Sequence, residues 1–364
     1  LLISDNYLLA QELISNMVSK ARGGNVALKL DMMKAYDRVV WPFLLNVLRA
    51  FEFGEQWIDM VWRLISNVWF SVVVNGALFG FFKSARGLRQ GDPLSPALFI
   101  IGAEVLSRSL NSLPCFRGFQ GFSVPRGCPR VTHLGYADDV LVFSSATARS
   151  LKLVKRVLTI YEAVSGQRIN AGKSCFLVHP KVGLSRKMAF QRLTGFMYKP
   201  FPIKYLGFPL YCGRRKKEYF GGLCQAVLLR IQSWQNRVLS QGGKIVLLKH
   251  VLSSMPIHLL MAASPPKAIF QELEGMFANF LWGATEGGPK YHWIRWQDLC
   301  VSQEAGGLAC ANWRMSTKLS LSSCGGIFGQ KHPCGLSSCK LSSVGRCTRI
   351  WCLMAKVQRC GHGW

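Results

Sequence analysis

Two adjacent carboxylates, Asp138 and Asp139, stand between two apolar runs in the stretch HLGYADDVLVFSS. Successive residues of a strand point to opposite faces, so both side chains reach one place only where the chain turns between two strands. A tight hairpin would put both at its tip. Unpaired carboxylates held among apolar residues repel each other and lose hydration, a penalty that a bound cation removes. The pattern therefore predicts a divalent metal site at a hairpin tip.

A third carboxylate, Asp31, ends the alternating stretch NVALKLDM. Val26, Leu28 and Leu30 share one face of this expected strand, so Asp31 lies on the face away from the core. Ligand sets made only of oxygen favour magnesium, which is commonly held by one or two carboxylates and substrate phosphates. Two such ions about 3.5 to 4 Å apart can activate an attacking 3′-oxygen and stabilise a leaving pyrophosphate in an in-line phosphoryl transfer.

The elements between these carboxylates follow from hydrophobic periodicity. Helical spacing of apolar residues predicts helices over WPFLLNVLRAF and EQWIDMVWRLISN, and SVVVNGALFGFF is typical of a strand pair that turns at Asn75-Gly76. In QGDPLSPALFIIGAEVLSRSL we expect Asp92 to cap a helix and Pro93 to occupy its first turn. The helix predicted over ARSLKLVKRVLTIYEAVSG ends at Gly166.

The second half of the chain is mainly helical in pattern. FPIKYLGFPLY predicts a short hairpin. From Glu218 to Trp282 three helical patterns follow, with breaks at Gly242-Gly243 and at Ser264-Pro265-Pro266. Lys and Arg occupy their polar sides, which indicates a separate basic helical domain.

Composition restricts the class of partner. The chain has 364 residues, with 45 Lys and Arg against 18 Asp and Glu, for a formal net charge of +27. We therefore expect its ligands to be anionic. The longest apolar stretch is interrupted by Glu104, and the first residues carry Asp5 and Glu12 where a secretory signal needs an apolar core. These features predict a soluble, intracellular protein that does not bind a membrane.

Three motifs occur in order: KLDMMKAYD, ARGLRQGDPLSPALF and LGYADDVLVF. Together they resemble the palm of reverse transcriptases, and ISDNYLLAQEL, GLRQGDPLSPALF and YLGFPL are similar to the LINE-type non-LTR retrotransposons of plants. The resemblance runs from Leu1 to about Trp313. It implies an α/β (α+β) fold: a right-hand polymerase palm with an antiparallel sheet, truncated fingers and a helical thumb-like domain.

The resemblance also implies catalytic roles. Asp31, helped by the backbone carbonyl of Met32, and Asp138 would hold two Mg²⁺ ions, with Asp139 completing the acidic pair. Tyr36 would lie under the sugar of the nucleotide, where its bulk excludes a 2′-hydroxyl and selects deoxynucleotides. An ordinary core aromatic is the alternative for Tyr36.

Further roles concern the substrate. Gln90 and Gly91 would lie over the incoming nucleotide, although Gly91 could equally form a helix-start turn. Lys173 matches a position that serves the departing pyrophosphate, and an exposed loop lysine is the alternative. The hairpin that resembles a primer grip carries three residues at its expected tip, or else packs as a buried hairpin: Tyr205, Leu206 and Gly207.

By the same resemblance, the partners are an RNA template, a DNA primer or target, and deoxynucleoside triphosphates, held through phosphate contacts. No protein partner can be deduced. The family leads us to expect a nuclear protein, and a weak basic cluster is compatible with that address: Arg214, Arg215, Lys216 and Lys217.

At both ends the chain departs from the family pattern. It enters the resemblance partway through the fingers, so we expect a chain that lacks the upper fingers and the endonuclease that the family carries upstream. No Asp or Glu follows Glu304, while Ser, Cys and Gly accumulate, so we expect residues 318–364 to be a frameshifted, disordered tail. We accordingly expect partial fingers and the first half of the palm in 1–110, the rest of the palm in 111–212, and the thumb in 213–317.

Two rivals to an active polymerase stay open. The chain could be a catalytically inactive, nucleic-acid-binding remnant of a decayed element, which keeps the basic surface alone. A maturase-type RNA-binding protein with a related palm would need an appended basic or endonuclease module, and the sequence shows none.

Overall fold

The computed structural model describes residues 3–18, 23–125, 128–235, 239–263, 265–285, 288–289, 291–301, 304 and 307–308. These residues divide by their contacts into two compact units. One unit contains residues 16–200, and the other joins residues 3–15 to the part of the chain after 200. The predicted domain boundaries at 110, 212 and 317 stay predictions. The predicted tail, 318–364, lies outside the described residues.

A five-stranded sheet forms the centre of the unit 16–200, in the order β4-β5-β1-β6-β7. Its pairs are antiparallel except for β6 with β7. The long central strand β1 pairs along its whole length with β5, so that Asn25 faces Ser145 and Asp31 faces Asp139. The strands are β1 (Asn25–Asp31), β4 (His133–Tyr136), β5 (Asp139–Ser145), β6 (Cys175–Val178) and β7 (Met197–Tyr198).

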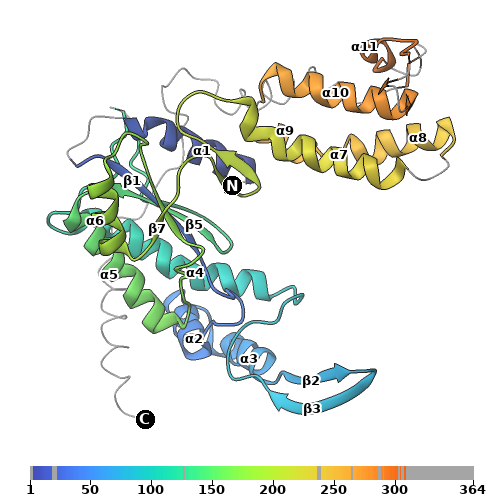
Figure 1. Cartoon of the computed structure of the whole chain (residues 1–364). Coiled ribbons are helices and arrows are strands. Elements are labelled where there is room, and N and C mark those ends of the chain that lie inside the picture. Colours follow the sequence, from blue (N-terminus) through green and yellow to red (C-terminus); the bar gives the residue numbers. More distant parts are fainter. Residues whose placement is uncertain are drawn as a thin grey trace. The chain divides into compact units, whose positions relative to one another are not determined.

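Helices cover one face of this sheet (Figure 1). Alternate residues of β1, Val26, Leu28 and Leu30, join apolar residues from α2, α4 and α5 in a single buried cluster. Burial of these side chains is the main favourable term for this unit. The helices are α2 (Trp41–Ala50), α3 (Glu55–Ser66), α4 (Ser95–Asn111), α5 (Ala148–Ser165) and α6 (Leu184–Thr194), with the 3-10 helices η1 (Asn16–Val18) and η2 (Leu113–Cys115).

Local sequence sets the ends of the long helix α5. Thr147 is its N-cap, and its hydroxyl accepts a hydrogen bond from the Ser150 amide. Gly166 is the C-cap with φ of 74°, a conformation that glycine adopts without strain. The predicted end at Gly166 is confirmed. The expected start of α4 is wrong, because this helix begins at Ser95 and not next to Pro93.

A separate hairpin extends from this unit (Figure 1). Its strands are β2 (Trp69–Val74) and β3 (Ala77–Lys83), and both central residues of the turn have positive φ, 51° at Asn75 and 82° at Gly76. The predicted strand pair and its turn are therefore confirmed. All residues of both strands are exposed, so apolar side chains lie open on this hairpin.

The second unit joins the first helix of the chain to the hairpin after residue 200. Tyr7 donates a hydrogen bond of 2.9 Å to the carbonyl of Pro209, and the Tyr205 hydroxyl donates one of 2.8 Å to Asn6 Oδ1. Its elements are α1 (Ile3–Ser15), β8 (Ile203–Tyr205), β9 (Phe208–Leu210), η3 (Lys217–Phe220), α7 (Gly221–Gln235), α8 (Gln241–Leu247), the π-helix η4 (Leu248–Leu252), α9 (Ile257–Ala262), α10 (Lys267–Trp282), β10 (Ala284–Thr285), β11 (Gly288–Pro289) and α11 (Trp296–Leu299).

The predicted helix breaks in this unit have different outcomes. The break expected at Gly242-Gly243 is wrong, because both glycines lie in the first turn of α8, where Ser240 caps the Gly243 amide. The break at 264–266 is confirmed, since α9 ends at Ala262 and α10 begins at Lys267. Within the described residues, no helix combines the length and the apolar character needed to cross a bilayer.

Candidate functional site

Two of the three predicted carboxylates lie directly opposite each other. Asp31 is the last residue of β1 and Asp139 the first of β5, and the antiparallel register pairs them. Directly opposed residues of such a pair place their side chains on the same face, with Cβ atoms about 4.5 to 5.5 Å apart. Both side chains are partly exposed. The fold therefore brings two acids more than 100 positions apart in sequence into side-chain range.

The third carboxylate, Asp138, lies in the turn of the hairpin between β4 and β5. Tyr136 pairs with Asp139, which leaves a two-residue turn of Ala137 and Asp138. Ala137 has φ of 51°, and the Asp138 carbonyl accepts a hydrogen bond of 3.3 Å from the Met32 amide. The predicted tight hairpin is confirmed. Its tip is fastened by backbone contact to the end of β1, and the Asp138 carboxylate is exposed.

The donor atoms at this place are of the kind that a hard divalent cation prefers. Carboxylate oxygens from β1, from the turn and from β5 lie at one edge of the sheet, and the Met32 carbonyl follows them in the chain. Among the residues that the structure describes, no group of three His, Cys, Asp or Glu side chains is already arranged around a metal position. The roles of Asp31, Met32, Asp138 and Asp139 as metal ligands stay predictions.

Two residues beside the carboxylates were not singled out from the sequence. Lys29 lies two positions before Asp31 on the same strand, and its Nζ is 3.1 Å from Asp139 Oδ1. Ser174 accepts a hydrogen bond of 3.0 Å from the Asp31 amide through its buried hydroxyl. The alternation of β1 already placed Lys29 on the face of Asp31, but the contact with β5 depends on the strand register.

The loop before β6 brings Lys173 near the same edge. The Asn170 amide donates a hydrogen bond of 2.8 Å to the Asp31 carbonyl, and the Lys173 amide bonds Asn170 in turn. The Lys173 side chain is exposed. Its backbone is thus positioned beside the carboxylates, and its contact with a leaving group stays a prediction.

Tyr36, Gln90 and Gly91 occupy a second, adjoining cluster. The Tyr36 ring stacks on Phe99 of α4 with centroids 4.8 Å apart, and Gln90 Nε2 donates a hydrogen bond of 3.3 Å to Asp37 Oδ1. Gly91 has φ of 89°, which supports the turn interpretation, while leaving the nucleotide contact as a prediction. The structure therefore places Gln90 beside the segment 36–37, and Gly91 follows Gln90 in the chain.

Gly87 explains how this cluster is held. The Gly87 amide bonds the Val39 carbonyl at 2.8 Å, and its carbonyl accepts a bond of 2.7 Å from Trp41 Nε1. Its φ is 94°, and a Cβ would lie 2.7 Å from the Asp37 carbonyl oxygen. Only glycine fits here. A pocket of about 210 Å³ opens beside this loop, lined in part by Arg86 and Arg89, which sequence reasoning also missed.

The predicted primer-grip hairpin lies in the other compact unit. Its turn consists of Leu206 and Gly207, with φ of 50° and 87°, as expected for a hairpin tip. Tyr205 is not at the tip, because it ends β8 and its side chain is fully buried against Asn6. The predicted contact with a primer stays a prediction, and the buried-hairpin alternative describes Tyr205.

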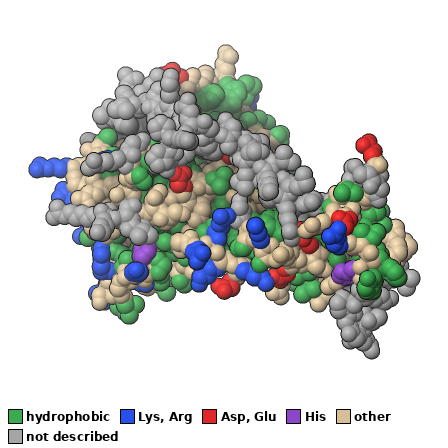
Figure 2. Space-filling model, turned by 90° about the horizontal axis from the view of Figure 1, so that it is seen from above, with side chains coloured by type: hydrophobic (Ala, Val, Ile, Leu, Met, Phe, Trp, Pro, Cys, Tyr) green, Lys and Arg blue, Asp and Glu red, His purple; other side chains and the backbone are tan. Residues whose placement is uncertain are grey.

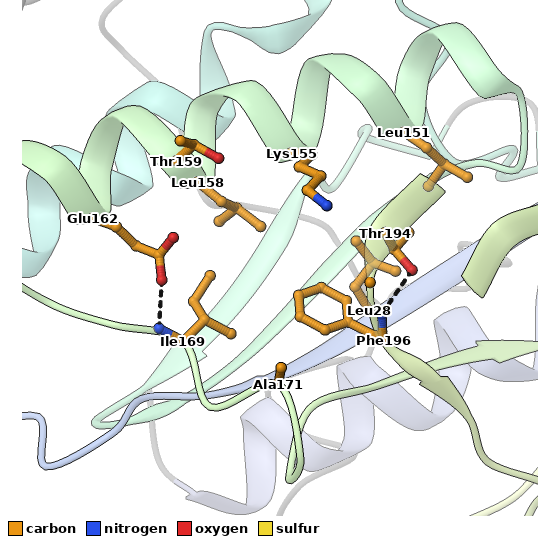
Figure 3. Close-up of a pocket in the computed structure, with 11 residues that line it drawn as sticks. Leu28, Leu151, Lys155, Leu158, Thr159, Glu162, Ile169, Ala171, Thr194 and Phe196 are labelled. Atoms are coloured by element: carbon orange, nitrogen blue, oxygen red, sulfur yellow. Dashed lines mark hydrogen bonds between the residues drawn. The ribbon is translucent and has the colours of Figure 1, made fainter. Parts of the chain in front are cut away.

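Another pocket of the unit 16–200 lies elsewhere. Leu28, Leu151, Leu158 and Phe196 line a cavity of about 210 Å³, into which Lys155 projects from α5 (Figure 3). Leu28 points into the helix-covered core, whereas side chains at odd positions of β1, such as Lys29, point to the opposite face. None of the predicted site residues lines this cavity, which we assign to imperfect packing between α5 and the sheet.

The base of the carboxylate hairpin contains a half-buried histidine. His133 is the first residue of β4. The Thr132 hydroxyl donates its proton to Asn111 Oδ1. The Thr132 oxygen therefore accepts a hydrogen bond of 3.0 Å from His133 Nδ1. The other ring nitrogen, Nε2, therefore accepts from the Ser107 hydroxyl at 3.0 Å. Burial lowers the pKa of His133 to about 4. The ring is accordingly neutral in the folded protein at neutral pH.

This histidine should make stability depend on pH. A folded-state pKa below the ordinary value near 6.5 means that the unfolded chain takes up the proton first as pH falls. Stability is full above about pH 6.5 and is lost progressively toward pH 4, by about 2 to 3 kcal/mol. We expect His133→Gln to lose this component. Urea unfolding of both proteins at pH 7.5 and 4.5 checks it, and equal pH-induced losses in both would contradict it.

Comparisons with known proteins follow the same region. The family model described as reverse transcriptase (RNA-dependent DNA polymerase) matches residues 3–210, more than half of the chain. The 149 kDa protein of transposon TX1 from Xenopus laevis is 27% identical over 297 residues, 80% of this chain and 21% of that protein. The Pol polyprotein of the type-2 retrotransposable element R2DM from Drosophila melanogaster is 31% identical over 150 residues, 41% of this chain and 13% of that protein.

The chain thus spans about a fifth or less of the length of these relatives. Among solved structures, telomerase from Candida tropicalis with a fragment of telomeric RNA is 13% identical, with a TM-score of 0.43 over 98% of this chain and 52% of that chain.

Proposed function

The chain belongs to the reverse transcriptase (RNA-dependent DNA polymerase) family and is the reverse transcriptase domain of a non-LTR retrotransposon. We therefore propose that it synthesises DNA on an RNA template. The mixed α/β fold with its mainly antiparallel sheet agrees with the predicted fold class. The observation that carries the proposal is the placement of Asp31 opposite Asp139, with Asp138 in the adjoining turn.

In this proposal, Asp31 and Asp138 hold the metal, Asp139 completes the acidic set, and the Met32 carbonyl adds a fourth oxygen donor. Two Mg²⁺ ions, when bound, supply Lewis acidity to the attacking 3′-oxygen and to the departing pyrophosphate. The chain's own part is to fix the oxygen donors: β1 and β5 orient Asp31 and Asp139, and the two-residue turn orients Asp138. Rigid placement on strands is what makes such a set effective.

The substrate residues support deoxynucleotide addition. Tyr36, held against Phe99, is proposed to contact the sugar, and Gln90 and Gly91 the incoming nucleotide. Lys173 is proposed to assist pyrophosphate departure. Leu206 and Gly207 are proposed to contact the primer end.

Template and primer are polyanions that suit a chain with a net charge of +27. Figure 2 shows one face of the molecule, on which blue Lys and Arg side chains gather at several places. The proposed partners are an RNA template, a DNA primer or target, and deoxynucleoside triphosphates. Their binding should weaken as salt rises, because phosphate contacts release counterions.

Two finer assignments belong to the same proposal. The motifs ISDNYLLAQEL and YLGFPL support a plant LINE-type element as the source. A nuclear location is supported by the exposed basic cluster from Arg214 to Lys217, although Lys217 also forms an ion pair of 2.8 Å with Glu272.

Primer extension tests the proposed function. The full chain, with poly(rA)/oligo(dT), dTTP and Mg²⁺, is expected to lengthen the primer, and EDTA is expected to stop the reaction. Filter binding of the same duplex, measured in parallel, gives the affinity for nucleic acid independently of catalysis. Binding without extension above background would favour the inactive remnant and contradict the proposal.

A further inference from the structure

Lys29 lies on the same face of the sheet as the paired carboxylates. It is two residues from Asp31 on β1, so the two side chains share a face. The register places Asp31 opposite Asp139 and Lys29 opposite Leu141. The ammonium Nζ of Lys29 reaches diagonally across to Asp139 Oδ1, 3.1 Å away. An ion pair thus lies directly beside the position assigned to the metal.

This ion pair is more enclosed than a surface pair. The side chains of Lys29 and Asp139 are 21% and 25% exposed. β1 is the central strand, and Lys29 has Leu141 of β5 on one side and Cys175 of β6 on the other. An ammonium in such a place needs an anion, because neither of these neighbours carries one. Partial burial also reduces screening by salt, so the charge of Lys29 acts strongly on its surroundings.

We propose that Lys29 neutralises Asp139 and competes with divalent metal for its carboxylate, and so acts on the metal site through Asp139. This inference rests on the proposed function and concerns the same site. The ammonium occupies Oδ1 of Asp139 and reduces by one the negative charge of the three carboxylates. A cation entering the site must therefore weaken or displace this ion pair. Asp31 and Asp138 are then the first carboxylates available to it.

The sign of the effect follows from charge. Without the ammonium the site is more negative, so a divalent cation binds more tightly. Coulomb's law for a unit charge roughly 5 Å from a divalent ion, at a dielectric near that of water, gives a change of about tenfold in affinity. If Lys29 instead served to orient Asp139 toward the metal, its removal would weaken binding.

Mn²⁺ titration of the full chain, followed by electron paramagnetic resonance of the free ion, tests the proposal without nucleic acid or catalysis. Lys29→Met is expected to bind Mn²⁺ about tenfold more tightly than the wild type. Lys29→Arg keeps the charge and should stay within about twofold. Lys29→Gln repeats the test if the Met variant does not fold. Unchanged or weaker binding by the neutral variants would overturn the proposal.

A double substitution shows whether Lys29 acts through Asp139. In an Asp139→Asn background the ion pair is already absent, so adding Lys29→Met should change Mn²⁺ affinity by clearly less than in the wild type. An equal change in both backgrounds would contradict the proposed route. Primer extension by the wild type distinguishes failure of this inference from failure of the proposed function. If the wild type extends primers and Lys29→Met leaves Mn²⁺ affinity unaltered, only this inference fails. Absence of both extension and Mn²⁺ binding overturns it with the proposed function.

Discussion

Asp138→Asn is expected to lower primer extension by at least about a thousandfold, since loss of several kcal/mol of charge stabilisation corresponds to several powers of ten in rate. Asn keeps the size of the side chain and one oxygen, but it removes the charge that a divalent cation requires. The fold should tolerate the change, because the carboxylate is exposed and the contact that fastens the turn uses the Asp138 backbone carbonyl.

Steady-state extension of oligo(dT) on poly(rA) measures this loss, and urea unfolding of the same preparations shows whether the variant is folded. Asp59→Asn is a matched control: Asp59 lies on the exposed side of α3, where its partner is Arg63 at 2.8 Å. The control should extend primers as the wild type does. Wild-type rates in Asp138→Asn would remove Asp138 from the catalytic set and, with it, the metal arrangement proposed for this edge of the sheet.

The local features of the fold could be predicted from sequence where one short-range rule decides them. The turn at Asn75-Gly76 and the helix end at Gly166 depend on residues that accept positive φ, and both are confirmed. The alternation of β1 correctly placed Leu28 and Leu30 in the core. It did not predict that Ala27 on the other face is also fully buried, where it pairs with Phe143, whose ring packs edge-on against Phe122.

The errors have two causes: contact between segments distant in the chain, and local capping that the sequence pattern did not reveal. Tyr205 was expected at a hairpin tip, but α1 supplies Asn6 as a partner for its hydroxyl and buries it. Adjacent glycines interrupt many helices. Here Gly242 and Gly243 lie in the first turn of α8, which Ser240 caps. The ion pair of Lys29 with Asp139 could not be found from spacing, since it depends on the exact pairing of two strands 110 residues apart.

The candidate site was more predictable than its supporting contacts. Carboxylates between apolar runs are unusual enough to be recognised as a set, and strand ends that carry them were expected to converge. The residues that hold the set, Ser174 and Gly87 among them, are small and ordinary in the sequence. Their importance comes from what they touch: the amide of Asp31 and the carbonyl of Asp37.

The second large effect is expected from substitution of Tyr36, the residue proposed to select against ribonucleotides. Its ring is partly exposed, and it is fixed by stacking on Phe99 and by the bond of 2.9 Å that its backbone carbonyl accepts from Leu88. A ring held in one position can exclude a 2′-hydroxyl by contact, whereas a mobile ring could move aside. We therefore expect Tyr36→Ala to raise the use of UTP relative to dUTP by roughly a hundredfold, the range that a single hydroxyl discriminated by shape usually spans.

The alternative, a purely structural Tyr36, predicts a different pattern. Truncation of a packed aromatic ring costs stability, up to about 3 to 5 kcal/mol when it is fully buried and less here. A structural role would lower the rates with UTP and dUTP together. Tyr36→Phe is the matched control, because it keeps the ring and removes only the hydroxyl: it should discriminate as the wild type does. Single-nucleotide extension with each substrate gives the ratio directly. An unchanged ratio in a folded Tyr36→Ala protein would show that another group selects the sugar, and would leave Tyr36 as packing for α4.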